Sequence, residues 1–137
     1  MGRENLLDNI SANRCFVCGP GNSHGLGVQF RLDGDVCRAE FVPTENYTGY
    51  NGIVHGGILF CLLDDVMANW LFLKGERCFT ARADVRYRQP LPVGTAVRME
   101  GRLLRRKGRV AQIEGKVFRQ DNDTVVVEAT GSFMVDA

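Results

Sequence analysis

The stretch from Gly52 to Leu73 constrains the fold of this chain more than any other. It begins with the run GIVHGG at residues 52–57 and continues with residues that are mostly large and apolar. A helix over this stretch has no polar face, so the rest of the protein must wrap around it. It is too short for a membrane span, and Asp64 and Asp65 interrupt its middle. Adjacent carboxylates in so apolar a segment are costly unless the protein uses them, which places the candidate functional site here.

Length and composition predict one soluble domain over 1–137. The chain is 45% apolar and 24% charged, as in ordinary globular proteins, and 137 residues can bury a substantial core. The N-terminus shows no apolar leader, because Glu4, Asp8 and Arg14 interrupt it. The five cysteines are odd in number and too sparse for a disulfide scaffold. We therefore expect reduced thiols in a cytoplasmic protein without a cofactor.

The N-terminal part divides into a helix and a loop. Apolar residues at near-helical spacing predict a short amphipathic helix within residues 1–14, followed by a cysteine- and glycine-rich loop over 15–27. Cys15, Cys18 and His24 in this loop could offer three zinc ligands. A single CxxC without a second pair is a weak signal, so the interpretation we favour is a structural loop without metal.

Most of the remaining chain shows the two-residue periodicity of antiparallel strands. Strands are expected over residues 28–32, 36–42, 82–88, 95–105, 110–119 and 124–135, with turns between them, and the helix over 56–73. One buried helix and a long antiparallel sheet predict an α+β domain whose sheet curls around the helix.

Positive charge is concentrated between Arg82 and Arg109. This segment holds nine basic residues against Asp84 and Glu100, although the net charge of the whole chain is only +1. The surplus is compatible with a polyanionic ligand and equally with a solvated strand face. Nucleic-acid binding is disfavoured because the chain has no recognition motif and is nearly neutral overall.

The order of these motifs resembles the hot-dog-fold thioesterases, in particular the 4-hydroxybenzoyl-CoA and phenylacetyl-CoA thioesterase-like branch. The resemblance is carried by GIVHGG at 52–57, by Leu62-Leu63-Asp64, by Thr80, and by the pattern Val85-x-Tyr87-x-x-Pro90; the N-terminal Cys15-x-x-Cys18-Gly19, Asn22 and Gly25-Leu26 add to it. It implies a hot-dog fold of about five or six strands around one long helix, and an acyl-CoA substrate. It also implies a homo-oligomer, either a dimer or a tetramer made of two dimers.

The resemblance selects catalytic residues. The family places an acidic residue eight positions after the first glycine of His-Gly-Gly, which is Asp64 rather than Asp65, and a hydroxyl residue at Thr80 that orients the attacking water. Some members have an asparagine six residues before the histidine, where this chain has Gly49; Asn51 is the nearest amide.

The residues themselves suggest the same chemistry. The first amides of a helix have no internal partner and lie at its positive end, and Gly56 and Gly57 allow a substrate carbonyl to approach them. Asp64 supplies a carboxylate that acts either as a general base on water or as a nucleophile. His55, at the helix start, is better suited to a structural or substrate-binding role than to catalysis.

Spacing predicts a composite site. Eight helical residues span about 12 Å, so one thioester cannot contact both Gly56 and Asp64 of the same helix. The working site should combine Gly56 of one protomer with Asp64 of another, in a homodimer or a homotetramer. Arginine and lysine side chains would bind the phosphates of coenzyme A, and the candidates are Arg82, Arg105, Arg106, Lys107 and Arg109.

Two function classes follow. The first is an acyl-CoA thioesterase, and the alternative is a non-catalytic acyl-CoA-binding or regulatory hot-dog module. Asp64 together with Thr80 favours the enzyme. A hot-dog hydratase is a weaker third interpretation because its Asp/His pair is not evident, and the absence of a Gly-x-Ser-x-Gly motif argues against a serine hydrolase.

Overall fold

The computed structural model describes residues 12–136. Most of the helix expected within residues 1–14 therefore lies outside the described residues. The described elements are β1 (Arg31–Asp33), β2 (Val36–Phe41), the 3-10 turn η2 (Glu45–Tyr47), α2 (Gly56–Phe72), β3 (Cys78–Tyr87), β4 (Val97–Lys107), β5 (Val110–Arg119) and β6 (Val125–Val135). No helix among them is long and apolar enough to cross a membrane.

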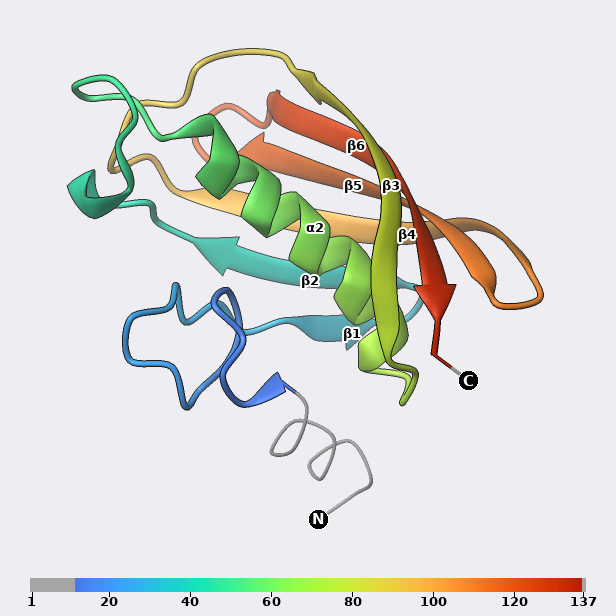
Figure 1. Cartoon of the computed structure of the whole chain (residues 1–137). Helices are drawn as coiled ribbons and strands as arrows, with labels where there is room; N and C mark the ends of the chain where they lie inside the picture. Colours follow the sequence, from blue (N-terminus) through green and yellow to red (C-terminus); the bar gives the residue numbers. More distant parts are fainter. Residues whose placement is uncertain (1–11, 137) are drawn as a thin grey trace.

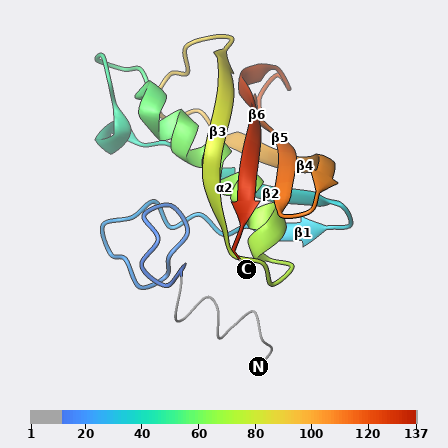
Figure 2. The same cartoon turned by 45° about the vertical axis from the view of Figure 1, so that its right-hand side comes forward.

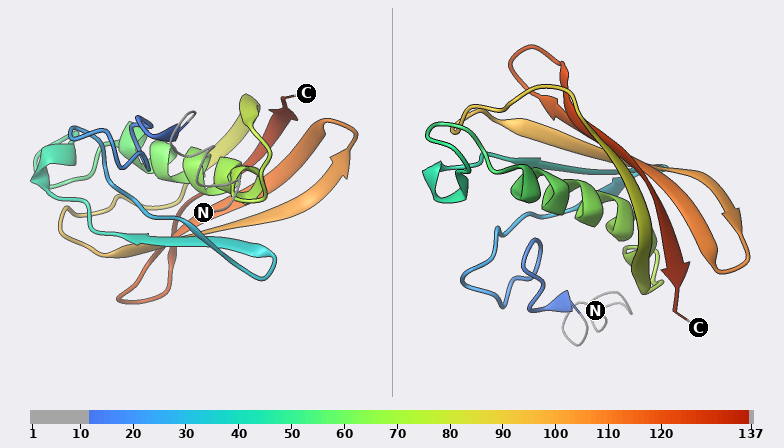
Figure 3. Two further views of the ribbon diagram at one scale, coloured as in Figure 1. Left: turned by 90° about the horizontal axis from the view of Figure 1, so that it is seen from below. Right: turned by 45° about the horizontal axis from the view of Figure 1, so that its top comes forward.

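The six strands form one antiparallel sheet in the order β1-β2-β4-β5-β6-β3. The sheet curls, and α2 lies along its concave face (Figures 1 and 2). Seen from below, the helix and the sheet form two layers (Figure 3). This arrangement confirms the predicted α+β hot-dog architecture.

Two strands start three or more residues from where they were expected. The first was expected over residues 28–32, but β1 covers only Arg31–Asp33. Val28 is buried, and its N–H donates to the carbonyl of Val17, so this segment holds the N-terminal loop instead of extending the sheet. β3 begins at Cys78, four residues before the expected start at Arg82.

The helix packs tightly against the middle of the sheet because two strands carry glycines there. A Cβ at Gly101 of β4 would lie 2.5 Å from the backbone oxygen of Val66, and one at Gly115 of β5 would lie 2.8 Å from Met67 Cγ. Gly101 and Gly115 face each other in the strand register. Glycine at these two positions therefore lets the helix pack close to the sheet, because any larger residue would collide with the helix.

One side of α2 is not fully covered by this chain. Leu62, Leu63, Val66 and Met67 are completely buried against the sheet. On the other side Ile58, Phe60, Cys61, Asp64 and Ala68 remain partly exposed. The sequence predicted that the rest of the protein wraps around the helix. Within a single chain this holds only for the side of the helix that faces the sheet.

Candidate active site

The start of α2 provides one backbone amide without a protein acceptor. His55 is the N-cap, and its Nδ1 accepts a hydrogen bond of 2.8 Å from the N–H of Gly57. The Gly57 amide is thus occupied by the cap. Among residues 12–136, the Gly56 N–H has no acceptor, and it lies at the positive end of the helix dipole. Of the two glycines predicted for the oxyanion site, Gly56 is the one with a free donor.

An open cavity of about 720 Å³ is lined in part by Gly56, the residue that carries this amide. Its lining includes His55 and Gly56 from the helix start, Tyr50 from the preceding loop, Tyr87 at the end of β3, and Arg88 directly after it. The loop is fixed to the segment after β3, because Val54 N–H donates to the carbonyl of Leu91 and Ile53 bridges to Pro92. Asn51 is exposed beside the cavity but is not part of its lining.

Asp64 and Thr80 are in direct contact. The Thr80 hydroxyl donates a hydrogen bond of 2.7 Å to Asp64 Oδ1, which joins the third turn of α2 to the start of β3. Thr80 is exposed and Asp64 is partly exposed, so the remaining carboxylate oxygen can reach solvent or a ligand. The pairing orients the carboxylate with a charge-assisted hydrogen bond.

The two parts of the candidate site are separate within one chain. Gly56 lines the cavity, whereas neither Asp64 nor Thr80 does. The helix rise of 1.5 Å per residue puts the two positions about 12 Å apart along α2. A single protomer therefore has the free backbone amide of Gly56 at one place and the carboxylate that Thr80 hydrogen bonds at another.

The basic residues proposed for phosphate binding have varied surroundings. Arg106 forms a two-pronged ion pair with Glu76 at 2.7 and 2.8 Å, and Arg109 Nε donates to the carbonyl of Val135. Arg82, Arg105 and Lys107 are exposed. The β4–β5 hairpin that carries four of these residues lies beyond the C-terminal end of α2, away from Gly56 (Figure 1).

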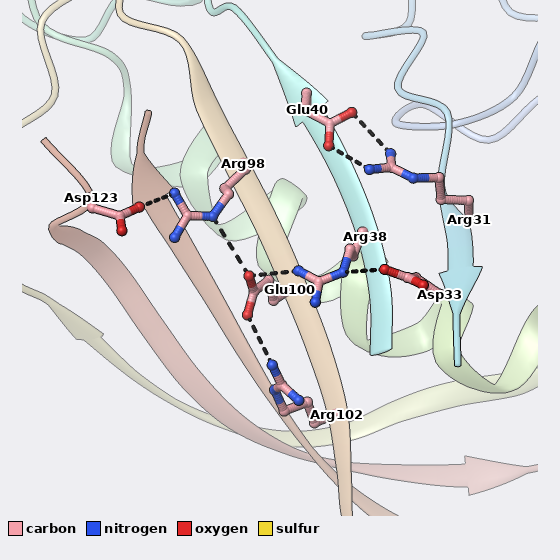
Figure 4. Close-up of polar contacts among 8 residues, drawn as sticks. All are labelled: Arg31, Asp33, Arg38, Glu40, Arg98, Glu100, Arg102 and Asp123. Carbon is pink, nitrogen blue, oxygen red and sulfur yellow. Dashed lines mark hydrogen bonds and ion pairs between the residues drawn. The ribbon is translucent and has the colours of Figure 1, made fainter. Parts of the chain in front are cut away.

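Part of the positive surplus is neutralised on the sheet face that points away from α2. There Glu100 of β4 accepts ion pairs from Arg38, Arg98 and Arg102, and Arg98 also pairs with Asp123 (Figure 4). Arg38 continues the network to Asp33, and Arg31 forks onto Glu40. These arginines therefore fit the interpretation of a solvated strand face better than that of a site for a polyanionic ligand.

Asp65 faces a different part of the molecule from Asp64. Its Oδ2 lies 3.5 Å from Cys15 Sγ in the N-terminal loop and 3.4 Å from Asn69 Nδ2. None of the ion pairs among residues 12–136 involves Asp65.

Tyr87 is the main site residue that sequence reasoning did not select. Its hydroxyl donates a hydrogen bond of 2.8 Å to the carbonyl of Gly56, and its ring lies 3.5 Å from where a Gly56 Cβ would be. The Val85-x-Tyr87-x-x-Pro90 pattern contains this residue. Its position over the helix start depends on a contact across 31 residues, which periodicity does not predict.

Comparisons with known proteins show the family of this chain. The sequence model of the thioesterase superfamily matches residues 51–126, which is more than half of the chain. The human acyl-coenzyme A thioesterase THEM5 is 28% identical over 122 residues, which cover 88% of this chain and 49% of that protein. The mouse protein of the same name is 24% identical over 94 residues. The chain thus spans about half the length of the curated relatives it matches or less.

Solved structures show the same fold. A thioesterase superfamily protein superposes with a TM-score of 0.78 at 30% identity, over 86% of this chain and 61% of that one. A phenylacetic acid degradation-related protein from Ralstonia eutropha JMP134 gives 0.75 at 26% identity, over 90% and 96%. A hypothetical thioesterase from Streptococcus pneumoniae, crystallised with coenzyme A, gives 0.75 at 16% identity, over 80% and 89%.

Proposed function

Because the chain belongs to the thioesterase superfamily, we propose that it is an acyl-CoA thioesterase, which hydrolyses a thioester to a free acid and coenzyme A. The observation that carries the proposal is the 2.7 Å hydrogen bond from Thr80 to Asp64. It holds a carboxylate at the surface of an apolar helix whose first amide, at Gly56, has no acceptor among the described residues. The acyl-CoA thioesterase relatives and a fold neighbour crystallised with coenzyme A support the choice of substrate.

The proposed chemistry uses the Asp64 carboxylate and the Gly56 amide together. Asp64 takes a proton from a water molecule while the water oxygen bonds to the thioester carbon, and the carbonyl oxygen becomes an oxyanion facing the Gly56 N–H. The intermediate then collapses, the carbon–sulfur bond breaks, and the coenzyme A thiolate leaves. In the second route Asp64 itself attacks the carbon, coenzyme A leaves, and water hydrolyses the resulting anhydride. Both routes need the same two groups.

The two groups come together if the protein is a homodimer. Gly56 of one protomer and Asp64 of the other would form one composite site, and each dimer would have two. The partly exposed side of α2 and the open edge of β3 support this assembly, because both are surfaces that a second copy would cover. The proposal allows either a dimer or a tetramer made of two dimers.

The remaining candidates would hold the substrate. His55 and Gly57 would shape the oxyanion site through their cap hydrogen bond, and Asn51 is exposed and follows the lining residue Tyr50. Arg82, Arg105, Arg106, Lys107 and Arg109 are proposed for the phosphates of coenzyme A, with the hairpin residues reaching a site shared with a second protomer. The five free cysteines fit the cytoplasmic location that we propose.

Release of free thiol from a panel of short-chain, aromatic and long-chain acyl-CoAs tests the proposal. Wild type is compared with Asp64→Asn and with Asp35→Asn, an equal charge change in an exposed turn. We expect turnover in wild type and Asp35→Asn, and a loss of roughly 10²–10⁴-fold in Asp64→Asn with ligand binding retained. Acyl-CoA binding without turnover in any variant would instead support the non-catalytic binding module. Unchanged turnover in Asp64→Asn would contradict the assignment of the carboxylate.

A further inference from the structure

The CxxC turn of the N-terminal loop is tightly closed. Cys18 N–H donates to Cys15 Sγ over 3.5 Å, and Gly19 N–H donates to the carbonyl of Cys15 over 2.9 Å. A Cβ at Gly19 would lie 2.3 Å from the Cys15 backbone nitrogen, so only glycine fits at this position. The turn therefore presents both sulfurs in the same direction.

The two thiols meet Asp65 of α2. Cys15 Sγ, Cys18 Sγ and a carboxylate oxygen of Asp65 all lie within 4.8 Å of one another. Asn69, one turn further along the helix, donates to the backbone carbonyl of Asp65 at 2.9 Å and to its Oδ2 at 3.4 Å. Its side chain is buried, so it can fix the orientation of the carboxylate in the way that outer-shell partners fix metal ligands.

We propose that Cys15, Cys18 and Asp65 form a binding site for a thiophilic divalent cation, with Zn²⁺ as the natural candidate. Zinc binds thiolates at about 2.3 Å and carboxylates at about 2.0 Å, and a tetrahedral arrangement of these bonds separates sulfur from oxygen by about 3.5 Å. The distance from Cys15 Sγ to Asp65 Oδ2 is 3.5 Å. His24, the third ligand suggested by sequence, is exposed and hydrogen bonds with Ser23 instead.

The electrostatics of the cluster suit a cation. Burial raises the pKa of Asp65 to about 7, and no ion pair among the described residues compensates its charge. The hydrogen bond between the two thiols lowers the pKa of Cys15 and raises that of Cys18. A divalent cation would replace the thiol protons, which leave to solvent, and would neutralise most of the resulting charge.

Three protein ligands leave one coordination position, and it faces a cavity. A cavity of about 330 Å³ is lined by the three cluster residues together with Phe72, Cys78 and Phe79. Water or a small ligand can complete the coordination from this side. The bound ion would fasten the loop over 15–27 to α2, next to Asp64.

Metal titration of the reduced full-length protein tests the site. After removal of metal with a chelator, Co²⁺ serves as the spectroscopic probe and Zn²⁺ as the competitor. We expect one Co²⁺ per chain, near-ultraviolet charge-transfer bands that report cobalt–thiolate bonds, loss of the bands when Zn²⁺ is added, and release of at least about two protons per ion.

Variants identify the ligands independently of catalytic activity. The Cys15→Ser plus Cys18→Ser protein should show no thiolate bands, and Asp65→Asn should bind Zn²⁺ at least about a hundredfold more weakly. His24→Ala and Cys61→Ser serve as matched controls and should bind as wild type does. Circular dichroism establishes that each variant is folded.

Three results would overturn the proposal. The first is the absence of saturable metal binding by reduced wild type. The second is the persistence of thiolate bands in the double cysteine variant. The third is a loss of affinity in His24→Ala equal to that in Asp65→Asn, which would restore the ligand set suggested by sequence.

Discussion

Adjacent carboxylates on α2 have different surroundings, and this separates their roles. Asp64 accepts a hydrogen bond from Thr80 and stays accessible, whereas Asp65 packs against the cysteine turn. They differ because successive residues of a helix point about 100° apart, so one side chain meets β3 and the other the N-terminal loop. One helix can thus carry a reactive carboxylate and a ligating carboxylate side by side.

The Thr80 hydroxyl should contribute to catalysis through Asp64. Thr80→Ala removes a hydrogen bond to a charged group, which is worth about 1.5–3 kcal/mol, so we expect kcat to fall by about ten- to a hundredfold. Thr80→Ser keeps the hydroxyl and should retain most of the activity. Steady-state kinetics with the best acyl-CoA from the panel measure both. Equal losses in the two variants would show that the methyl group, not the hydrogen bond, matters.

The Gly56 amide can be deleted without breaking the helix. Gly56 is the first helical residue, where proline is tolerated, and His55 before it has the extended backbone (ψ 132°) that precedes proline readily. We expect Gly56→Pro to lower kcat by about 10²–10³-fold, as loss of an oxyanion donor does.

Gly56→Ala is the matched control for that variant. It keeps the amide, and its Cβ would meet Tyr87 at an ordinary 3.5 Å. Kinetics and circular dichroism of both variants separate loss of the donor from loss of the fold. A proline variant as active as the alanine variant would mean that this amide does not stabilise the oxyanion.

At the scale of elements, the contact of α2 with the sheet depends on glycine. At Gly101 a Cβ would be 2.5 Å from the backbone of Val66, which cannot move as a side chain can. Gly101→Ala should therefore lower the free energy of unfolding by about 1–3 kcal/mol through overpacking. Arg102→Ala, the neighbouring position on the other face of β4, should change it by less than about 0.5 kcal/mol. Denaturant unfolding measures both values, and equal stabilities for the two variants would contradict the packing argument.

The elements were predictable from sequence where their patterns are local. The apolar run after GIVHGG predicted α2, and the two-residue alternation predicted most of the sheet. β1 is shorter than expected because Val28 packs against the N-terminal loop, which its own strand-like pattern does not reveal.

The candidate site was predictable in part. The resemblance selected Asp64 and Thr80, and the structure joins them by a hydrogen bond. The occupation of the Gly57 amide by His55 depends on a side-chain rotamer, and the approach of Cys15 to Asp65 spans 50 residues. Neither has a periodic signature. Counting charges between Arg82 and Arg109 overestimated the unpaired positive charge there. Some of these arginines pair with acidic residues elsewhere in the chain, as Arg98 does with Asp123.

For the whole molecule, β3 is the feature that points to assembly. Among the strands that the structure describes, it forms an outer edge of the sheet and pairs only with β6, and Phe79 on it is more than half exposed. A long open edge of this kind is usually covered in solution. We expect the protein to elute as a dimer or a larger even-numbered oligomer in size-exclusion chromatography with light scattering. A Phe79→Lys variant should dissociate it and lower turnover, while a monomeric wild type with full activity would contradict a shared site.

Subunit complementation tests the composite site most directly. Differently tagged Gly56→Pro and Asp64→Asn chains are mixed, and thioesterase activity is measured in purified heterodimers. One of the two sites in each heterodimer then holds an intact Gly56 and an intact Asp64, so the purified heterodimers should have about half of wild-type activity. The matched control pairs wild type with a chain carrying both substitutions, whose heterodimers should have no complete site. Rescue in the first mixture and none in the control heterodimers is the predicted result. Inactive heterodimers in the first mixture, with half-active heterodimers in the control, would show that each chain contains its own complete site.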